Sequence, residues 1–131
     1  MATVRSHAVV NRDAESVWRI VSDAPAISAW FPAITQSDGN GSYRTVTLQD
    51  GARLQEEVVT CDPALRRFQY RVVGGDLPIE AHLGTVDVLE LGPRKCAVVY
   101  STDIEPPDLA DAFGPAIEEA VSNLARVASG S

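Results

Sequence analysis

Two neighbouring glutamates in a predicted strand are the first candidates for acid–base chemistry. Strand alternation puts Glu56 and Glu57 on opposite faces: Glu57 with Gln55, Val59 and Cys61, and Glu56 with Leu54 and Val58. One of the two carboxylates must therefore face the interior side of the sheet, where burial raises its pKa and suits it to proton transfer. The alternative is an exposed glutamate, or one paired with Arg44, Arg53 or Arg71.

His82 is the second candidate, because histidine exchanges protons near pH 7. Nearby Gly84 would permit a ligand to approach the backbone or would mark a bulge. Strand alternation does not decide which face of the sheet His82 is on. Val86 and Val88 lie on the same face as His82, but Leu83 and Leu89 make the opposite face apolar as well. A surface histidine, or a hydrogen-bonded one in the core, is the alternative. His7 alternates with polar neighbours and is expected to be exposed.

Aromatic and aliphatic side chains could line a ligand cavity. Tyr70 and Tyr100 each share a strand face with apolar residues, so each could present a hydroxyl to a cavity or simply pack in the core. Trp30, next to Pro32, could wall one end of a pocket, while Trp18 is expected to pack. Phe113 and Ile117 lie on the apolar stripe of a predicted helix and are expected to contact the ligand. Asp103 and Glu105 are expected to be solvated.

Motifs for other chemistries do not occur in the sequence. It has no Gly-x-Ser-x-Gly, no HExxH and no Walker or Rossmann glycine pattern, so nucleophilic hydrolysis, zinc proteolysis and nucleotide use lack support. Cys61 and Cys96 have neither CxxC spacing nor a histidine at zinc-ligand distance, and both are expected to be buried thiols. We expect no metal and no cofactor, so any catalysis would be general acid–base chemistry on a bound molecule.

Length and charge narrow the class of protein. The 131 residues, 45% apolar and 22% charged, suit one globular domain over residues 1–131. The net charge of -7 and the scattered arginines make nucleic acid an unfavourable partner. The N-terminus has no stretch apolar enough for a signal peptide or a membrane span, so we expect a cytoplasmic protein.

The elements that must position these residues begin with a strand and two short helices. Residues 3–10 alternate as a half-covered strand, with Val4, Ser6, Ala8 and Val10 on one face. Ala14, Val17, Trp18 and Val21 then follow helical spacing, and Asp23 with Pro25 predicts a second short helix through Trp30.

From residue 33 to 105 the sequence predicts five or six antiparallel strands. Asp50-Gly51 predicts a tight hairpin between Tyr43–Gln49 and Ala52–Cys61. Asp62-Pro63 leads into Arg66–Val73, and Gly92–Arg94 joins Ala81–Leu91 to Lys95–Ile104. A helix from about Pro115 to Ala128 closes the chain, with Gly114-Pro115 marking either its start or a kink. We therefore expect an α+β fold in which a curved antiparallel sheet of about seven strands, two short helices and a long C-terminal helix enclose a cavity.

At this point the sequence resembles the START-like or SRPBCC superfamily, which includes polyketide cyclases and dehydrases, lipid-transfer domains, birch-pollen-allergen-like proteins and abscisic-acid receptors. Ala14–Asp23 resembles the family's first helix, and Trp30–Ile34 the end of its second. Asp50-Gly51 with Glu57, the segment Asp62–Tyr70, Pro78, Thr85-Val86 and Val99–Pro106 follow the family's order and spacing over nearly the whole chain.

The resemblance implies the helix-grip fold and favours Glu57 over Glu56 as the inward carboxylate. Small bacterial members commonly carry Trp where this chain has Tyr100, which adds a hydroxyl at that position. In the hormone receptors of this superfamily, two loops form a gate that closes over the ligand. Gly74–Pro78 takes the place of one of these loops, but the other is reduced to Gln49–Ala52, so the resemblance does not imply a full gate of the receptor type.

Three hypotheses follow. In the first, a cyclase, aromatase or dehydrase binds a small, mainly apolar, polyketide-like molecule and uses Glu57 and His82 as catalytic groups, with Trp30, Tyr70, Tyr100, Phe113 and Ile117 around the ligand. In the second, the same cavity belongs to a non-catalytic carrier or sensor of a lipid-like or hormone-like ligand. In the third, the domain regulates a partner protein through an exposed apolar patch. We expect a monomer or a homodimer.

Overall fold

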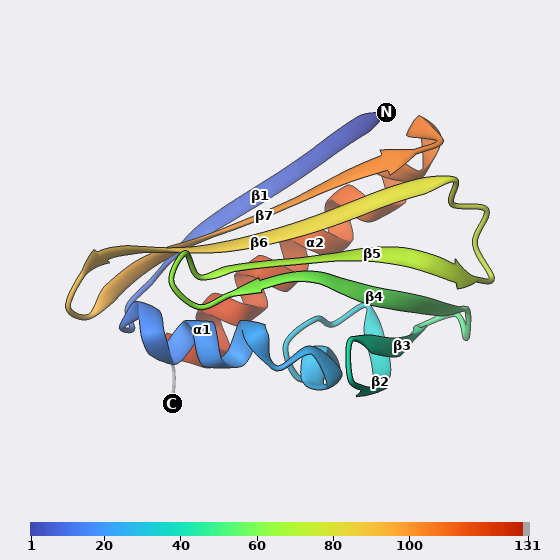
Figure 1. Ribbon diagram of the computed structural model, residues 1–131. Helices are drawn as coiled ribbons and strands as arrows, with labels where there is room; N and C mark the ends of the chain where they lie inside the picture. Colours follow the sequence, from blue (N-terminus) through green and yellow to red (C-terminus); the bar gives the residue numbers. More distant parts are fainter. Residues whose placement is uncertain (130–131) are drawn as a thin grey trace.

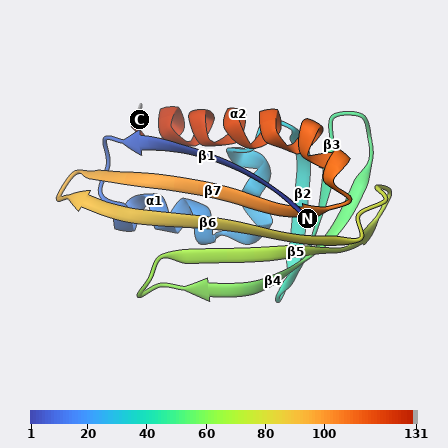
Figure 2. The same ribbon diagram turned by 90° about the horizontal axis from the view of Figure 1, so that it is seen from above.

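A computed structural model describes residues 1–129, and within them seven antiparallel strands form one curved sheet (Figure 1). The strand order is β1-β7-β6-β5-β4-β3-β2. The bounds are β1 (Ala2–Val10), β2 (Ile34–Asn40), β3 (Tyr43–Leu48), β4 (Arg53–Asp62), β5 (Arg67–Gly75), β6 (Ala81–Gly92) and β7 (Lys95–Glu105). Seen from above, β2 and β3 run crosswise to the longer strands and close one end of the sheet (Figure 2). The expected α+β fold is confirmed.

Local sequence signals account for the N-terminal elements. In β1, exposure alternates as predicted, with Val4, Ser6, Ala8 and Val10 on the covered face. Helix α1 (Ala14–Ser22) is capped by Asp13, whose Oδ2 accepts a hydrogen bond of 3.0 Å from the Ser16 amide. The 3-10 helix η1 (Ala24–Ala29) has Pro25 in its first turn, as the sequence indicated.

Tight turns connect the strands where the sequence placed them. Gly51 takes a φ of +89°, which the hairpin between β3 and β4 requires, and the Leu48 amide donates to the Ala52 carbonyl across that turn. Irregular pairing between β4 and β5 near Val59 changes which side of β4 faces the interior. One expectation is wrong here: Cys96 is buried, but Cys61, one residue before the end of β4, is exposed.

The C-terminal helix begins earlier than the sequence predicted. A short 3-10 turn, η2 (Pro107–Leu109), leads directly into α2 (Ala110–Ser129), so Pro115 lies inside the helix rather than at its start. Proline removes one backbone donor, but packing outweighs this loss: Gly114 lies against Val4, and α2 runs along β1 and β7 (Figure 2). The apolar stripe of α2 buries Ile117, Val121 and Leu124 against the sheet.

The core fills the space between α2, α1 and the inner face of the sheet. Its largest fully buried side chains include Tyr100, Ile104, Leu124, Val10 and Val98. No helix within residues 1–129 has the length and apolar character needed to cross a membrane.

Candidate functional site

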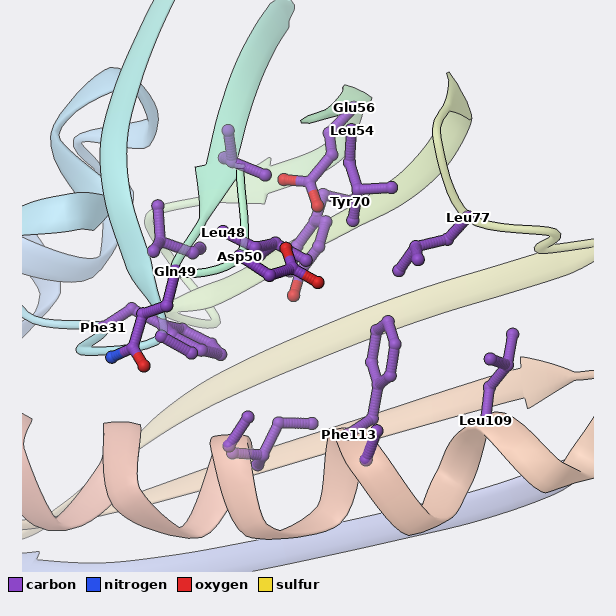
Figure 3. A pocket seen from close by; sticks show the side chains of 16 residues that line it. Phe31, Leu48, Gln49, Asp50, Leu54, Glu56, Tyr70, Leu77, Leu109 and Phe113 are labelled. Carbon is purple, nitrogen blue, oxygen red and sulfur yellow. The ribbon is translucent and has the colours of Figure 1, made fainter. Parts of the chain in front are cut away.

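A cavity of about 390 Å³ opens between the β2–β5 end of the sheet and the first half of α2 (Figure 3). Most of its wall is apolar, from Phe31 at one end to Leu77 and Leu109 at the other. Helix α2 supplies Ala112, Phe113, Ala116 and Ile117, and the facing strands supply Ile34, Val46, Leu48 and Leu54. This volume lies within the range of small-molecule sites in proteins.

Four polar side chains also line the cavity. Glu56 and Tyr70 come from β4 and β5, whereas Gln49 and Asp50 belong to the turn between β3 and β4 (Figure 3). Among the described residues that line it, none is a lysine, an arginine or a histidine. The wall therefore offers carboxylates and hydroxyl or amide groups, but no positive charge.

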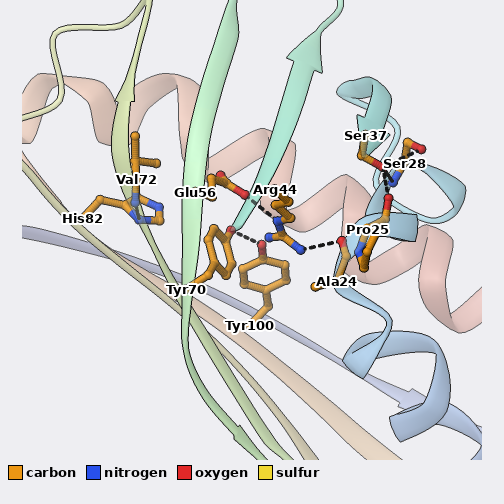
Figure 4. A network of polar contacts seen from close by, with 10 residues as sticks. All are labelled: Ala24, Pro25, Ser28, Ser37, Arg44, Glu56, Tyr70, Val72, His82 and Tyr100. Atoms are coloured by element: carbon orange, nitrogen blue, oxygen red, sulfur yellow. Dashed lines mark hydrogen bonds and ion pairs between the residues drawn. The ribbon is translucent and has the colours of Figure 1, made fainter. Parts of the chain in front are cut away.

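Glu56 forms a buried ion pair with Arg44 of β3 (Figure 4). The Arg44 Nε donates to Glu56 Oε1 at 2.7 Å, and the two side chains are only 1% and 5% exposed. Burial raises the pKa of the Glu56 carboxyl, and the guanidinium of Arg44 opposes this increase. No group in residues 1–129 donates a hydrogen bond to the second carboxylate oxygen of Glu56, which leaves that oxygen for the cavity that the side chain lines.

Arg44 itself is held behind the cavity wall. Its Nη1 donates to the Ala24 carbonyl at 3.0 Å, and its guanidinium carbon lies 4.6 Å from the centre of the Tyr70 ring and 5.5 Å from that of Phe68. The Nη2 group has no hydrogen-bond partner within the described chain. Contact with the two ring faces compensates part of the cost of burying this charge.

The hydroxyls of Tyr70 and Tyr100 share a hydrogen bond, and both side chains are buried (Figure 4). Burial raises the pKa of both phenols, so both stay protonated at neutral pH. Two hydroxyls carry two protons but need only one for their mutual bond. When Tyr100 donates to Tyr70, the Tyr70 hydroxyl can donate to a ligand oxygen in the cavity.

His82 faces the interior but does not reach the cavity surface. Its Nδ1 accepts a hydrogen bond of 3.2 Å from the Val72 amide, and its ring lies beside that of Tyr70 (Figure 4). The ring also packs against Phe113 of α2. Burial, followed by the positive charge of Arg44, lowers the pKa of His82 to about 4. At neutral pH this histidine is uncharged and supports the side chains that line the cavity.

Glu57 does not face the interior, so the expectation that it is the inward carboxylate is wrong. It lies on the outer face of β4, where Arg71 Nη2 contacts its Oε1 at 2.6 Å. Hydrogen bonds from Arg71 and Tyr43 lower the pKa of Glu57. The physical reason is the register: β3 pairs Val46 with Leu54 and Arg44 with Glu56, which turns Glu56 inward with the apolar residues.

The other predicted contact residues divide into two groups. Tyr70, Phe113 and Ile117 line the cavity. Trp30 and Tyr100 lie one layer behind it: their ring centres are 6.0 Å from that of Phe31, which forms the wall in their place. The Trp30 carbonyl accepts a hydrogen bond of 2.9 Å from Asn123 of α2, which fixes this corner of the cavity.

Sequence reasoning missed Arg44 as a buried residue, although a signal was present. In β3, alternation puts Arg44 on the same face as Val46 and Leu48, which marks an inward arginine that must find a carboxylate partner. For Asp50 the sequence predicts a hairpin turn, and the resemblance places it in the reduced gate segment Gln49–Ala52, but neither predicts that it lines the cavity. Within residues 1–129, no group of three or more His, Cys, Asp or Glu side chains could hold a metal ion.

Comparison with known proteins adds the family. The family model described as "Polyketide cyclase / dehydrase and lipid transport" matches residues 1–129. No curated protein matches the sequence.

Three solved structures illustrate the likeness of fold. XoxI from Bacillus cereus is 19% identical, with a TM-score of 0.87 over 98% of this chain and 96% of its own. A START superfamily protein from Mycobacterium smegmatis is 21% identical, with a TM-score of 0.73 over 98% and 94%. The di-domain ARO/CYC BexL from the BE-7585A biosynthetic pathway is 16% identical, with a TM-score of 0.77 over 97% of this chain but 47% of BexL. These matches confirm the START-like fold.

Proposed function

Because the chain belongs to the polyketide cyclase / dehydrase and lipid transport family, we propose that it binds a small, mainly apolar molecule in the cavity and transfers protons on it, in a cyclisation or dehydration of a polyketide-like substrate. One observation carries this proposal: a buried carboxylate, that of Glu56, lies in the wall of an otherwise apolar cavity. The aromatase/cyclase BexL shares the fold and lends further support.

The chemistry assigned to Glu56 is that of a general base and acid. Its free oxygen takes a proton from the carbon next to a ketone, the resulting enolate attacks a second carbonyl carbon, and Glu56 returns the proton to the alkoxide that forms. In a dehydration Glu56 first takes the proton from the carbon next to the ketone, and the electron pair of the enolate then forms the C=C bond as the neighbouring C–O bond breaks. Glu56 returns the proton to the departing hydroxyl group, which leaves as water. The raised pKa of Glu56 suits it to hold a proton between these steps.

Tyr70 and the apolar wall supply the remaining parts of the proposed mechanism. The Tyr70 hydroxyl donates a hydrogen bond to the ketone oxygen and stabilises the negative charge that develops there. Phe31, Phe113 and Ile117 exclude water and hold the flexible molecule folded, so that its reacting carbons stay close together.

Binding in the cavity is tested by filling it. Ala116 lines the cavity from α2, so Ala116→Trp should abolish the fluorescence increase of the uncharged apolar probe N-phenyl-1-naphthylamine. The control is Ser122→Trp, which places the same side chain on the exposed side of α2 and should leave the increase unchanged. Equal probe binding by both variants would contradict the proposal. Native mass spectrometry of the purified wild type would identify any retained molecule.

Proton transfer is tested without knowledge of the substrate. We expect the wild type to accelerate exchange of the protons next to the carbonyl of 2-nonanone in D₂O, followed by NMR, and Glu56→Gln to lose about a hundredfold or more of this acceleration. Glu57→Gln, on the outer face, is the matched control and should keep it. Should Glu56→Gln fail to fold, R44M/E56L removes both charges and serves as the second variant. Equal exchange by wild type and the Glu56 variants would refute the catalytic role.

A non-catalytic carrier is the second candidate, because Arg44 already pairs with Glu56 and offsets its charge. A carrier would bind 2-nonanone without accelerating its exchange. The rate of proton exchange in 2-nonanone bound to the wild type therefore distinguishes an enzyme from a carrier.

A further inference from the structure

The geometry points to a ligand with a positively charged amine attached to its apolar body, an inference that rests on the proposed binding of a small molecule in the cavity. The preference comes from the side chains that surround this space. The proposed ligand is therefore an apolar amine rather than any apolar molecule.

The first step is the charge of the wall. Two ionisable carboxyl groups line the cavity, Glu56 on β4 and Asp50 in the turn between β3 and β4, and no cationic side chain does so among the described residues. Figure 3 shows both side chains directed toward the space between the sheet and α2. Arg44 offsets the charge of Glu56, so Asp50 supplies the uncompensated negative charge and Glu56 supplies a free acceptor oxygen. A carboxylate on the ligand would be repelled by Asp50, while an ammonium would be attracted to it and could donate to both groups.

The second step is the position of Arg44, which pairs with Glu56 behind the cavity wall; its Nη2 group has no partner within residues 1–129 but is buried with the rest of the side chain. Its Nε and Nη1 groups donate to Glu56 and to the Ala24 carbonyl, and its guanidinium lies against the Tyr70 ring behind the wall. With 1% of its side chain exposed, Arg44 cannot reach an anionic group in the cavity. A fatty-acid head group would therefore lose its water without gaining a positive partner.

The third step is the free hydrogen-bonding capacity of the carboxylates. Glu56 uses Oε1 for Arg44, and Asp50 uses Oδ1 to accept from the Ala52 amide at 2.9 Å. The second oxygen of each group has no partner within residues 1–129, and the Glu56 side chain is 5% exposed. An ammonium has three donors and no acceptor, so it matches acceptors of this kind. The net charge of -7 also favours the approach of a cation to the molecule.

Three probes with the same eight-carbon chain test the inference: octylamine, 1-octanol and octanoate. At pH 7 and low ionic strength, isothermal titration calorimetry should rank their affinities in that order, with octanoate about tenfold or more weaker than octylamine. Added salt should reduce the advantage of octylamine, because Asp50 is exposed to solvent.

Asp50→Asn is the informative variant, because asparagine can keep the acceptor for the Ala52 amide and suits a turn. It should lower the affinity for octylamine and leave that for octanol unchanged. Glu119→Gln, on an exposed part of α2 outside the cavity, changes the net charge equally and should leave both affinities unchanged.

The outcomes separate this inference from the proposed function. Octanoate binding as tightly as octylamine, or an octylamine affinity equal in wild type and Asp50→Asn, would overturn the amine preference and leave the cavity as a binding site. Failure of all three probes to bind the wild type would contradict the proposed function and the amine preference together. Octylamine binding that survives Ala116→Trp would place the amine outside the cavity and also overturn the inference.

Discussion

Arg44 and Glu56 carry opposite charges in a part of the molecule that solvent does not reach. Taking two such charges out of water is costly, and their attraction repays this cost only while both are present. Arg44 also contacts the faces of Tyr70 and Phe68, so the aromatic rings and the ion pair depend on one another. Removing one partner should therefore destabilise the fold more than removing both, because only the single change leaves a buried charge without its counter-charge.

Glu56→Gln should lower the free energy of unfolding by about 3 kcal/mol, because it leaves the Arg44 charge buried without a counter-charge. The double variant R44M/E56L should lose less, since no buried charge remains. Glu57→Gln on the outer face should change the free energy by no more than about 0.5 kcal/mol. Urea denaturation at pH 7 measures all three, and a double variant less stable than Glu56→Gln would contradict this account.

His82 should make the free energy of unfolding depend on pH. Its pKa falls from 6.5 to about 4 on folding, so between these values the unfolded chain binds a proton that the folded protein does not. The stabilisation is complete above about pH 6.5 and is lost as the pH falls toward 4, by about 3 kcal/mol in total.

The measurement compares wild type with His82→Gln by urea denaturation from pH 7 to pH 4. Carboxyl groups titrate in both proteins, so the difference between the two curves reports His82 alone. We expect the free energy of unfolding to fall less in the variant. Parallel curves would mean that His82 has the same pKa in both states of the protein.

The sequence divides Glu56 and Glu57 onto two faces, but alternation alone does not say which face is inside. The neighbours do not decide it, because Leu54 and Val58 accompany Glu56 while Val59 and Cys61 accompany Glu57. The resemblance pointed to the wrong residue because the pairing of β4 with β3 decides the facing, and that register depends on contacts distant in sequence. Asp50 shows the same limit, because a turn residue reaches a cavity only through the curvature of the whole sheet.

At the scale of elements, the pairing of β5 with β6 depends on a glycine. Tyr70 of β5 is paired with Gly84 of β6, and the Tyr70 ring lies directly over that glycine. A Cβ atom at residue 84 would lie 2.5 Å from the Tyr70 ring, so only glycine lets the ring rest on β6 and form the cavity wall. The glycine that suggested a ligand or a bulge in the sequence thus accommodates a tyrosine of the neighbouring strand.

Gly84→Ala should push the Tyr70 ring away from β6 and lower the free energy of unfolding by about 1–3 kcal/mol. Gly92→Ala is the matched control on the same strand, because no atom lies within 4 Å of its added methyl group. Urea denaturation gives the free energies, and near-UV circular dichroism reports the tyrosine environment. An unchanged tyrosine signal in Gly84→Ala would show that β6 moves instead of the ring.

Elements with strong local signals were predicted well from the sequence. The hairpins at Asp50-Gly51 and at Gly92–Arg94 follow from turn residues whose preferred backbone conformation fixes the connection. The start of α2 was missed because Pro115 opposes a helix locally, while contact with β1 stabilises it over the full length. The apolar stripe that includes Phe113 indicated a helix on both sides of the proline, but it left open whether Pro115 starts the helix or lies within it.

At the scale of the whole molecule, the cavity joins segments from distant parts of the chain. Phe31, Glu56, Tyr70 and Ile117 come from four separate regions, and they meet only when α2 lies on the finished sheet. A ligand bound among them therefore binds the folded state and not the unfolded chain.

Octylamine should consequently stabilise the entire fold. At a free concentration one hundred times its Kd, the free energy of unfolding should rise by about 2.7 kcal/mol, measured by urea denaturation with and without the amine. Ala116→Trp, with the cavity filled, should show no such increase. Tight binding by the wild type without stabilisation would contradict a site built from these distant segments.

The small side chains that α2 presents to the cavity have a consequence for evolution. Ala112 and Ala116 are not part of the buried core, whereas the sheet residues opposite them largely are. Ala112 is exposed and Ala116 packs at the edge of the core, so exchanging either alanine alters the space available without replacing a buried core side chain. Descendants of one ancestral domain could thus come to accept molecules of different size through single changes on one turn of one helix.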